Sequence, residues 1–258
     1  MLEQVMLEGG GSLAFVLVAA VLAGVINTVV GSGSLLTFPA LLLVGLPALQ
    51  ANMTNTLGLV AGSVSGAWGS RRELAGTEPT IYRLMLPSGA GAVIGAFLLL
   101  TLPPTVFQAV VPILIVVSCI LVAFQPYISS RASKAEVRPI GSPSPAGSSV
   151  AFVIGIYGGY FGAAQGILLI ATLGLVYGGS LHWSNAAKNV LQAVAVVVAS
   201  SILVFAGNPS WPYVGVIAIG STVGALIGAR IAPKISPGLL RGAVIVIGVV
   251  TATVWVLR

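Results

Sequence analysis

Two stretches of this chain, GAVIGAFLLLTLPPTVFQ (residues 91–108) and GALIGARIAPKISPGLLR (residues 224–241), are two versions of one segment. Their glycines and prolines match at one constant offset: Gly91 with Gly224, Gly95 with Gly228, and Pro104 with Pro237. The similarity extends outward over residues 81–124 and 214–257. Long apolar repeats in the two halves of a membrane chain are typical of transporters whose binding site lies between the repeats. We therefore predict an all-α polytopic membrane protein built from two repeats.

The composition supports a membrane protein rather than a soluble one. Hydrophobic residues make up 57% of the 258 residues and charged residues only 6%, whereas soluble domains carry about 25% charged residues. The 11 Lys and Arg residues outnumber the 5 acidic residues, but most of them lie in short loops between apolar runs. Such loops follow the positive-inside rule, so we expect a lipid bilayer, and no nucleic acid, as partner.

Several of the 33 glycines are spaced four residues apart, which lets membrane helices approach one another closely. These pairs are Gly62 and Gly66, Gly91 and Gly95, Gly220 and Gly224, and Gly224 and Gly228. We expect a methyl group at Gly95 to weaken packing by costing close approach of the helices, without straining the dihedral angles of Gly95.

Six apolar runs are long enough to cross a bilayer, which takes roughly 20 residues. They cover residues 51–70, 81–101, 104–124, 185–206, 212–230 and 238–257. Two further apolar stretches, residues 12–45 and 148–178, are interrupted by the clusters NTVVGSGS (27–34) and YGGYFGAAQG (157–166). Dense glycines break a helix, and broken backbone at membrane depth must line a cavity or be covered by protein. We predict that each stretch is a broken, re-entrant hairpin with its tip near the bilayer midplane.

These elements divide the chain into three parts. We predict a first transmembrane repeat at residues 12–124, a cytoplasmic linker at 125–147 and a second, inverted repeat at 148–257. Each repeat consists of one hairpin followed by three transmembrane helices. The linker is polar and carries three basic residues: Arg131, Lys134 and Arg138.

The loop charges predict the inversion of the second repeat. In the first half, segment 71–83 is basic and the turn at residues 102–103 is uncharged. In the second half the pattern is exchanged, because residues 206–212 are uncharged while Arg230 and Lys234 are basic. Since basic loops face the cytoplasm, corresponding loops of the two repeats lie on opposite sides of the membrane.

Polar residues at matching positions of the two repeats are candidates for a binding site. Thr54 and Asn55 follow the first hairpin and align with Lys188 and Asn189, which follow the second. Lys188 lies in an apolar helix, where a charge at the bilayer centre costs roughly 3 kcal/mol. It either faces the hairpin tips and binds an anion together with helix N-termini, or it snorkels to the membrane surface. The sequence alone leaves both readings open.

The broken segments contribute further candidates: Asn27, Gly31, Ser32, Gly33 and Ser34 in the first hairpin, and Gly162 and Gln165 in the second. The turn at residues 31–34 must let backbone N–H groups approach an anion, and we expect its glycines to need positive φ angles. Hydroxyl and amide side chains here either contact the substrate or satisfy freed backbone groups. Both roles remain open for each of them.

Motifs of enzymes and of ATP-driven pumps are missing from the sequence. There is no GxxxxGK[ST] for ATP, no HExxH and no Ser-His-Asp order. The five acidic residues are all Glu and lie outside the apolar runs, which excludes an acidic proton relay through the membrane. His182 has no Cys, Asp or Glu close in sequence and is a poor candidate for a metal ligand. We expect no enzymatic activity, no cofactor and no metal site, so any coupling would use the substrate's own proton, Lys188, His182 or sodium.

Three segments of the chain resemble the TauE/SafE family of sulfite exporters, also described as the 4-toluene sulfonate uptake permease family. They are AGVINTVVGSGSLLTFPALLLVGLPALQANMTNTLG (23–58), GGYFGAAQGILLI (158–170) and NAAKN (185–189). The family pattern has a proline after the first glycine-rich turn, which Pro39 fits, whereas Gln165 stands where the family often has another glycine. The resemblance implies export of sulfite, sulfoacetate or another organosulfonate from the cytoplasm across the cell's inner (plasma) membrane.

The residues and the family resemblance indicate the same mechanism. The two hairpin tips and the starts of the following helices would form a midplane site for a small anionic substrate, open alternately to each side. A passive anion channel with the same site, and a membrane assembly factor without transport, are the alternatives. The sequence also leaves open whether the chain forms a homodimer.

Overall fold

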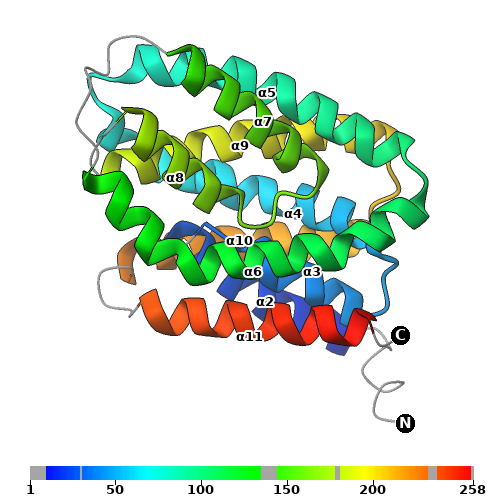
Figure 1. Cartoon of the computed structure of the whole chain (residues 1–258). Coiled ribbons are helices and arrows are strands. Elements are labelled where there is room, and N and C mark those ends of the chain that lie inside the picture. Colours follow the sequence, from blue (N-terminus) through cyan, green and yellow to red (C-terminus); the bar gives the residue numbers. More distant parts are fainter. Residues whose placement is uncertain (1–9, 30, 135–143, 178–180, 232–236, 257–258) are drawn as a thin grey trace.

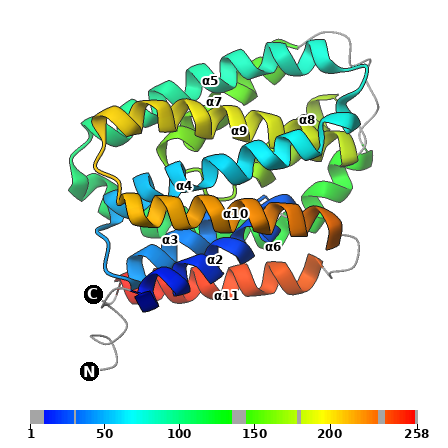
Figure 2. The same cartoon turned by 180° about the vertical axis from the view of Figure 1, so that it is seen from behind.

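The computed structural model describes residues 10–29, 31–134, 144–177, 181–231 and 237–256. These residues form ten α-helices and one short 3-10 helix. Figures 1 and 2 show how the helices are arranged. The elements are α2 (Gly10–Val29), α3 (Ser34–Leu43), α4 (Ala48–Gly69), η1 (Arg71–Leu74), α5 (Glu78–Thr101), α6 (Pro104–Lys134), α7 (Pro145–Tyr160), α8 (Gln165–Tyr177), α9 (Leu181–Ala206), α10 (Trp211–Ile231) and α11 (Pro237–Val256). The middle of the predicted linker, with Arg138, and the basic residue Lys234 lie outside the described residues.

The helix boundaries follow the apolar pattern of the sequence. Each of the six apolar runs corresponds to one helix. The two glycine-rich clusters fall at the breaks between α2 and α3 and between α7 and α8. Both confirm the prediction of an all-α protein whose apolar stretches are interrupted at the glycine clusters.

Five helical segments in the described part of the chain are long and apolar enough to cross a membrane: Gly10–Thr28, Pro79–Thr101, Pro104–Tyr127, His182–Ala206 and Trp211–Gly228. The first hairpin is therefore asymmetric, with a long first arm in α2 and a second arm, α3, of only 10 residues. α4 and α11, both expected to span, are not among these segments: α4 has 22 residues, and α11 contributes only the shorter apolar segment Arg241–Thr253. The first half of α4 carries Asn52, Thr54 and Asn55, and these polar side chains are buried inside the protein.

Helices from the two halves of the chain pack against each other throughout the bundle (Figures 1 and 2). α5 lies along α7, and α10 lies along α2. The first arm of each hairpin is thus covered by a helix from the other half. In the middle, α4 packs against α9 and α10, and α9 packs against α4 and α5.

The basic loops share one end of the bundle, on the left in Figure 1. η1 carries Arg71 and Arg72, α6 ends at Lys134, and α10 ends directly after Arg230. The connections from α3 to α4, from α5 to α6 and from α9 to α10 lie at the opposite end and have no charged residue. The segments predicted to face the cytoplasm are therefore neighbours in space wherever they are described.

The closest helix contacts are made at glycines. A Cβ atom at Gly91 would lie 2.1 Å from the carbonyl oxygen of Phe152, and one at Gly95 would lie 2.1 Å from that of Ile156. As expected, a methyl group at Gly95 would cost the close approach of α5 and α7, whose backbones touch there, and the φ angle of Gly95 is not positive. A Cβ atom at Gly66, by contrast, would meet nothing within 4 Å.

Candidate functional site

The two hairpin tips touch each other inside the protein. Gly31 and Gly162, one in each tip, have φ angles of +83° and +72°, which only glycine adopts without strain. A Cβ atom at Gly31 would lie 3.1 Å from Cα of Gly166, and one at Gly166 would lie 2.8 Å from the carbonyl oxygen of Gly31. The glycines therefore allow the two broken segments to meet, as the sequence predicts.

Gly33 is needed for a different reason than expected. Its φ angle is −57°, in the ordinary helical region, so the expectation of a positive φ is wrong for this residue. A Cβ atom at Gly33 would lie 2.6 Å from the carbonyl oxygen of Ala23 and 2.9 Å from Cβ of Asn27. Close packing of the turn against α2, rather than backbone conformation, requires glycine here.

Lys188 extends between the two tips. Its side chain is fully buried, and its Cδ atom would lie 3.3 Å from a Cβ at Gly31 and 2.8 Å from a Cβ at Gly166. The ammonium group donates a hydrogen bond of 3.3 Å to the carbonyl oxygen of Asn27, in the last turn of α2. The negative end of a helix dipole favours a cation at this place. Of the two readings of Lys188, the snorkelling one is wrong, because the side chain does not reach the surface.

Gln192 is a site neighbour that the sequence reading missed. It lies one turn after Lys188 on α9, and its Nε2 atom donates a hydrogen bond of 3.2 Å to Oδ1 of Asn27. The signal for it was the spacing of four residues, which places both side chains on one face of the helix. Together, Lys188 and Gln192 hold the end of α2 through both oxygens of Asn27.

The short helices α3 and α8 both begin at the contact between the tips. Among the described residues, the backbone N–H groups of Ser32, Gly33, Ala163 and Ala164 have no hydrogen-bond partner. The first N–H groups of a helix are unpaired, and the helix dipole makes this end positive. Two helix N-termini and one ammonium group thus surround the tips, which is an arrangement suited to an anion.

The second tip is fixed by neutral polar groups. The hydroxyl of Tyr157 donates to the carbonyl oxygen of Ala163, and Ser118 donates to the same oxygen at 3.2 Å. From α4, Nδ2 of Asn52 donates a hydrogen bond of 2.9 Å to the carbonyl oxygen of Tyr160, the last residue of α7. Sequence analysis did not select Asn52, although it lies two residues before Thr54 in the same polar segment.

Gln165, a predicted site residue, lies against α7. Its side chain is fully buried over Gly158, whose Cβ would lie 2.3 Å from Nε2 of Gln165. Nε2 donates to the carbonyl oxygen of Ile154 at 3.5 Å, and Oε1 is buried without a partner. Gly158 therefore leaves the space that the larger residue at the start of α8 fills.

Three residues predicted to belong to the site form hydrogen bonds with other parts of the protein, and not with the glycines at which the two tips meet. Thr54 accepts a hydrogen bond of 2.9 Å from the N–H of Ser210, in the connection between α9 and α10. Asn189 donates at 3.1 Å to Ser70, at the end of α4. Asn55 accepts a hydrogen bond from Thr37 of α3. Ser34, the first residue of α3, is half-buried.

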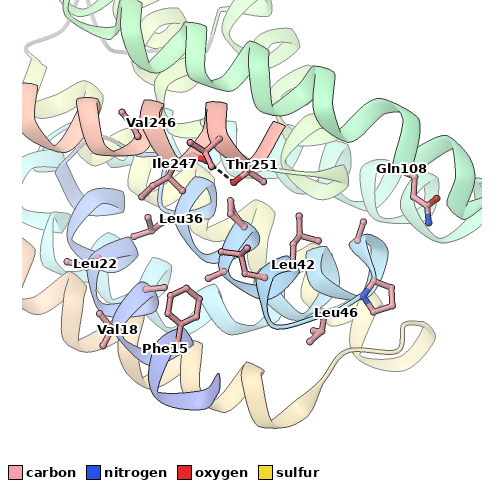
Figure 3. A pocket seen from close by; sticks show the side chains of 18 residues that line it. Phe15, Val18, Leu22, Leu36, Leu42, Leu46, Gln108, Val246, Ile247 and Thr251 are labelled. Atoms are coloured by element: carbon pink, nitrogen blue, oxygen red, sulfur yellow. Dashed lines mark hydrogen bonds between the residues drawn. The ribbon is translucent and has the colours of Figure 1, made fainter. Parts of the chain in front are cut away.

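A cavity in the described part of the chain lies away from these residues. It has a volume of about 860 Å³ and is bounded by α2, α3, α11 and the start of α6, as Figure 3 shows. Its lining is apolar except for Gln108 and Thr251, and the hydroxyl of Thr251 is bonded to the carbonyl oxygen of Ile247 at 2.7 Å. An apolar cavity offers no compensation for the lost hydration of an oxyanion. The hairpin tips therefore remain the candidate site, and the cavity is a separate feature.

Comparisons with known proteins agree on one family. The family model described as sulfite exporter TauE/SafE matches residues 16–254. The chain is 29% identical over 199 residues, 77% of this chain and 75% of the relative, to the probable membrane transporter protein ORF9 of Sinorhizobium sp. It is 25% identical over 232 residues, 90% of this chain and 84% of the relative, to the probable membrane transporter protein YfcA of Escherichia coli strain K12. No solved structure matches the chain. The chain therefore belongs to the TauE/SafE sulfite exporter family, a family of multi-pass membrane transporters and not of enzymes.

Proposed function

We propose that this transporter exports a small sulfur oxyanion or organosulfonate, such as sulfite, by alternating access at the hairpin tips between two inverted repeats. The observation that carries the proposal is Lys188, a fully buried lysine placed between Gly31 and Gly166 where α3 and α8 begin. Membership of the family suggests a sulfur compound as the substrate, and the residues of the site favour an anion.

The glycine contacts support an inverted repeat. A Cβ at Gly24 would lie 2.3 Å from the carbonyl oxygen of Ser221, and a Cβ at Gly155 would lie 2.3 Å from that of Ser88. Gly24 and Gly155 lie on the first hairpin arms, whereas Ser221 and Ser88 lie on α10 and α5. Each contact thus recurs in the other half of the chain with the partners exchanged. A two-fold pseudo-symmetry axis between the repeats accounts for this exchange.

Lys188 and the hydrogen-bond donors at the tips favour an anion over a cation. The protonated side chain of Lys188 brings a positive charge, and charge-assisted hydrogen bonds are about twice as strong as neutral ones. The unpaired N–H groups at the starts of α3 and α8 add donors at the same place. A monovalent anion here would compensate the buried ammonium group.

Burial of the site favours a carrier over an open channel. Lys188 and Gln165 are fully buried, and Ser32 is 1% exposed. Protein therefore covers these groups, which supports an occluded state of an alternating-access cycle.

Counterflow of labelled sulfite in proteoliposomes tests the transport mode. Vesicles preloaded with unlabelled sulfite should transiently accumulate labelled sulfite, because only a carrier exchanges one anion for another. Passive equilibration without accumulation would identify a channel. Absence of sulfite flux, together with no stabilisation of the purified protein by any anion, would favour an assembly factor.

A further inference from the structure

Three buried oxygen atoms around the hairpin tips have no hydrogen-bond partner among the described residues. They are Oγ of Ser32, Oε1 of Gln165 and Oδ1 of Asn52. Ser32 and Asn52 are 1% exposed, and Gln165 is fully buried. A buried polar atom without a partner costs about 1–3 kcal/mol, and most such atoms in native proteins have one. Three such atoms close to one proposed site indicate a ligand that forms hydrogen bonds with them.

The hydrogen bonds of the two side-chain amides show which atom of each amide is the nitrogen and which is the oxygen. Nδ2 of Asn52 donates to the carbonyl oxygen of Tyr160, and Nε2 of Gln165 donates to that of Ile154. A carbonyl oxygen only accepts, so exchanging nitrogen and oxygen in either amide would set two acceptors against each other. The two unpartnered amide oxygens are therefore acceptors, which need a donor, whereas the hydroxyl of Ser32 can donate as well as accept.

These acceptors lie beside the groups that would bind the anion. Ser32 directly follows Gly31, and Gln165 directly precedes Gly166, so both flank the place where the tips touch. Asn52 contacts the residue at which α7 ends, on the other side of the same turn. A fully deprotonated oxyanion has only acceptors and would repel the two amide oxygens, although it could accept a hydrogen bond from Ser32. A substrate with an O–H or N–H group would satisfy one or both of the amide oxygens.

The charge available at the site limits the charge of the substrate. Lys188 is the one charged side chain that is fully buried in the described part of the chain. The positive ends of α3 and α8 are offset by the negative ends of α2 and α7, which lie at the same turns. One positive charge remains, and a dianion would leave a buried negative charge uncompensated.

We propose that the site takes an anion with a single negative charge and a hydrogen-bond donor of its own. Hydrogen sulfite and hydroxyalkyl sulfonates belong to this class, whereas the sulfite dianion and sulfoacetate do not. Lys188 and the helix N-termini bind the charged sulfur-oxygen group. Oε1 of Gln165 or Oδ1 of Asn52 accepts the hydrogen bond from the donor of the substrate. This inference rests on the proposed function, because it assumes that the substrate is a sulfur anion bound at the tips.

Two sulfonates that differ by one hydroxyl group test the donor. Isothermal titration of the purified full chain should show that 2-hydroxyethanesulfonate binds about 3- to 10-fold more tightly than ethanesulfonate, the gain expected for one neutral hydrogen bond. Sulfoacetate, with its second negative charge, should bind more weakly than 2-hydroxyethanesulfonate. Replacement of the acceptor in Gln165→Leu should bring the ratio of the two affinities toward one. Gln165→Met, which keeps an unbranched side chain, provides a second variant without the acceptor if the leucine variant does not fold.

The outcomes separate this inference from the proposed function. Equal affinity of the wild-type protein for ethanesulfonate and 2-hydroxyethanesulfonate would contradict the proposal that the substrate donates a hydrogen bond. It would mean that water forms hydrogen bonds with the buried oxygens. If sulfoacetate bound more tightly than 2-hydroxyethanesulfonate, the proposal that the substrate carries a single negative charge would be contradicted. Failure of every sulfonate and of sulfite to bind would instead contradict the proposed function.

Discussion

Replacement of Lys188 by methionine separates the charge of the side chain from its volume. Methionine is unbranched and flexible, so it can occupy the passage between Gly31 and Gly166 that the aliphatic part of Lys188 fills. It removes the ammonium group and the hydrogen bond to the carbonyl oxygen of Asn27. Because hydrogen bonds to charged groups contribute about 1.5–3 kcal/mol, we expect the affinity for sulfite to fall by about 10- to 150-fold.

The effect can be measured as ligand-induced stabilisation. A ligand at 100 times its dissociation constant stabilises the folded protein by about 2.7 kcal/mol. At the same sulfite concentration, the weaker binding of Lys188→Met should reduce this to about 0.3–1.4 kcal/mol. Without ligand, the variant should unfold at the same temperature as the wild-type protein or at a higher one, since a buried charge with a single neutral acceptor is expensive to desolvate.

Thermal unfolding in detergent, with and without sulfite, checks both expectations. Lys234→Met is the matched control, because it removes the same charge from the sequence between α10 and α11. It should keep the full stabilisation by sulfite. If Lys188→Met kept it as well, Lys188 would be a structural residue that fastens α2, and the anion site would have to be sought elsewhere.

Three further changes test the tips, the packing and the orientation. Gly31→Val should abolish sulfite efflux at normal expression, because a branched side chain strains the positive φ and clashes with Gly166; efflux at the wild-type rate would make the turn mere scaffold. Gly95→Ala should destabilise the protein by about 1–3 kcal/mol through overpacking, whereas Gly66→Ala should stabilise it by about 0.5–1 kcal/mol. Unfolding temperatures in the reverse order would contradict the contact between α5 and α7. A cysteine at Asn208 should react with an impermeant thiol reagent in intact cells and one at Arg131 only after permeabilisation, and the opposite pattern would exclude the predicted orientation.

The fold could be predicted well because it depends on local properties of the sequence. Apolar runs and glycine clusters mark where helices start and break, whatever those helices later touch. Contact distances between helices are not local. Gly95 and Gly66 stand in the same spacing pattern, yet one lies against the backbone of α7 and the other against open space. No feature of their own segments separates the two.

The candidate site could be predicted only in part. Lys188 stands out because a lone charge in an apolar run must have a partner. Gln192 and Asn52 do not stand out, since neutral amides occur elsewhere in this chain and their importance depends on the carbonyl groups that face them. The alignment of Thr54 with Lys188 predicted corresponding positions in the two repeats, but it did not predict which groups these residues contact. In the first half of the chain, Asn52 contacts the end of the opposite hairpin arm, while Thr54 bonds to Ser210.

Asn27 links anion binding to the position of the first hairpin. In the described state its carbonyl oxygen accepts a hydrogen bond from Lys188, and its side-chain oxygen accepts one from Gln192. A substrate that takes up the ammonium group competes with the carbonyl oxygen at the end of α2, so binding weakens one of the two bonds that fasten this arm to α9. The end of α7 is held by the neutral Nδ2 group of Asn52, which is not a charge for which the anion competes. Under the proposed mechanism, the anion therefore acts unequally on the two hairpins, and the first is the one whose attachment changes when the site fills.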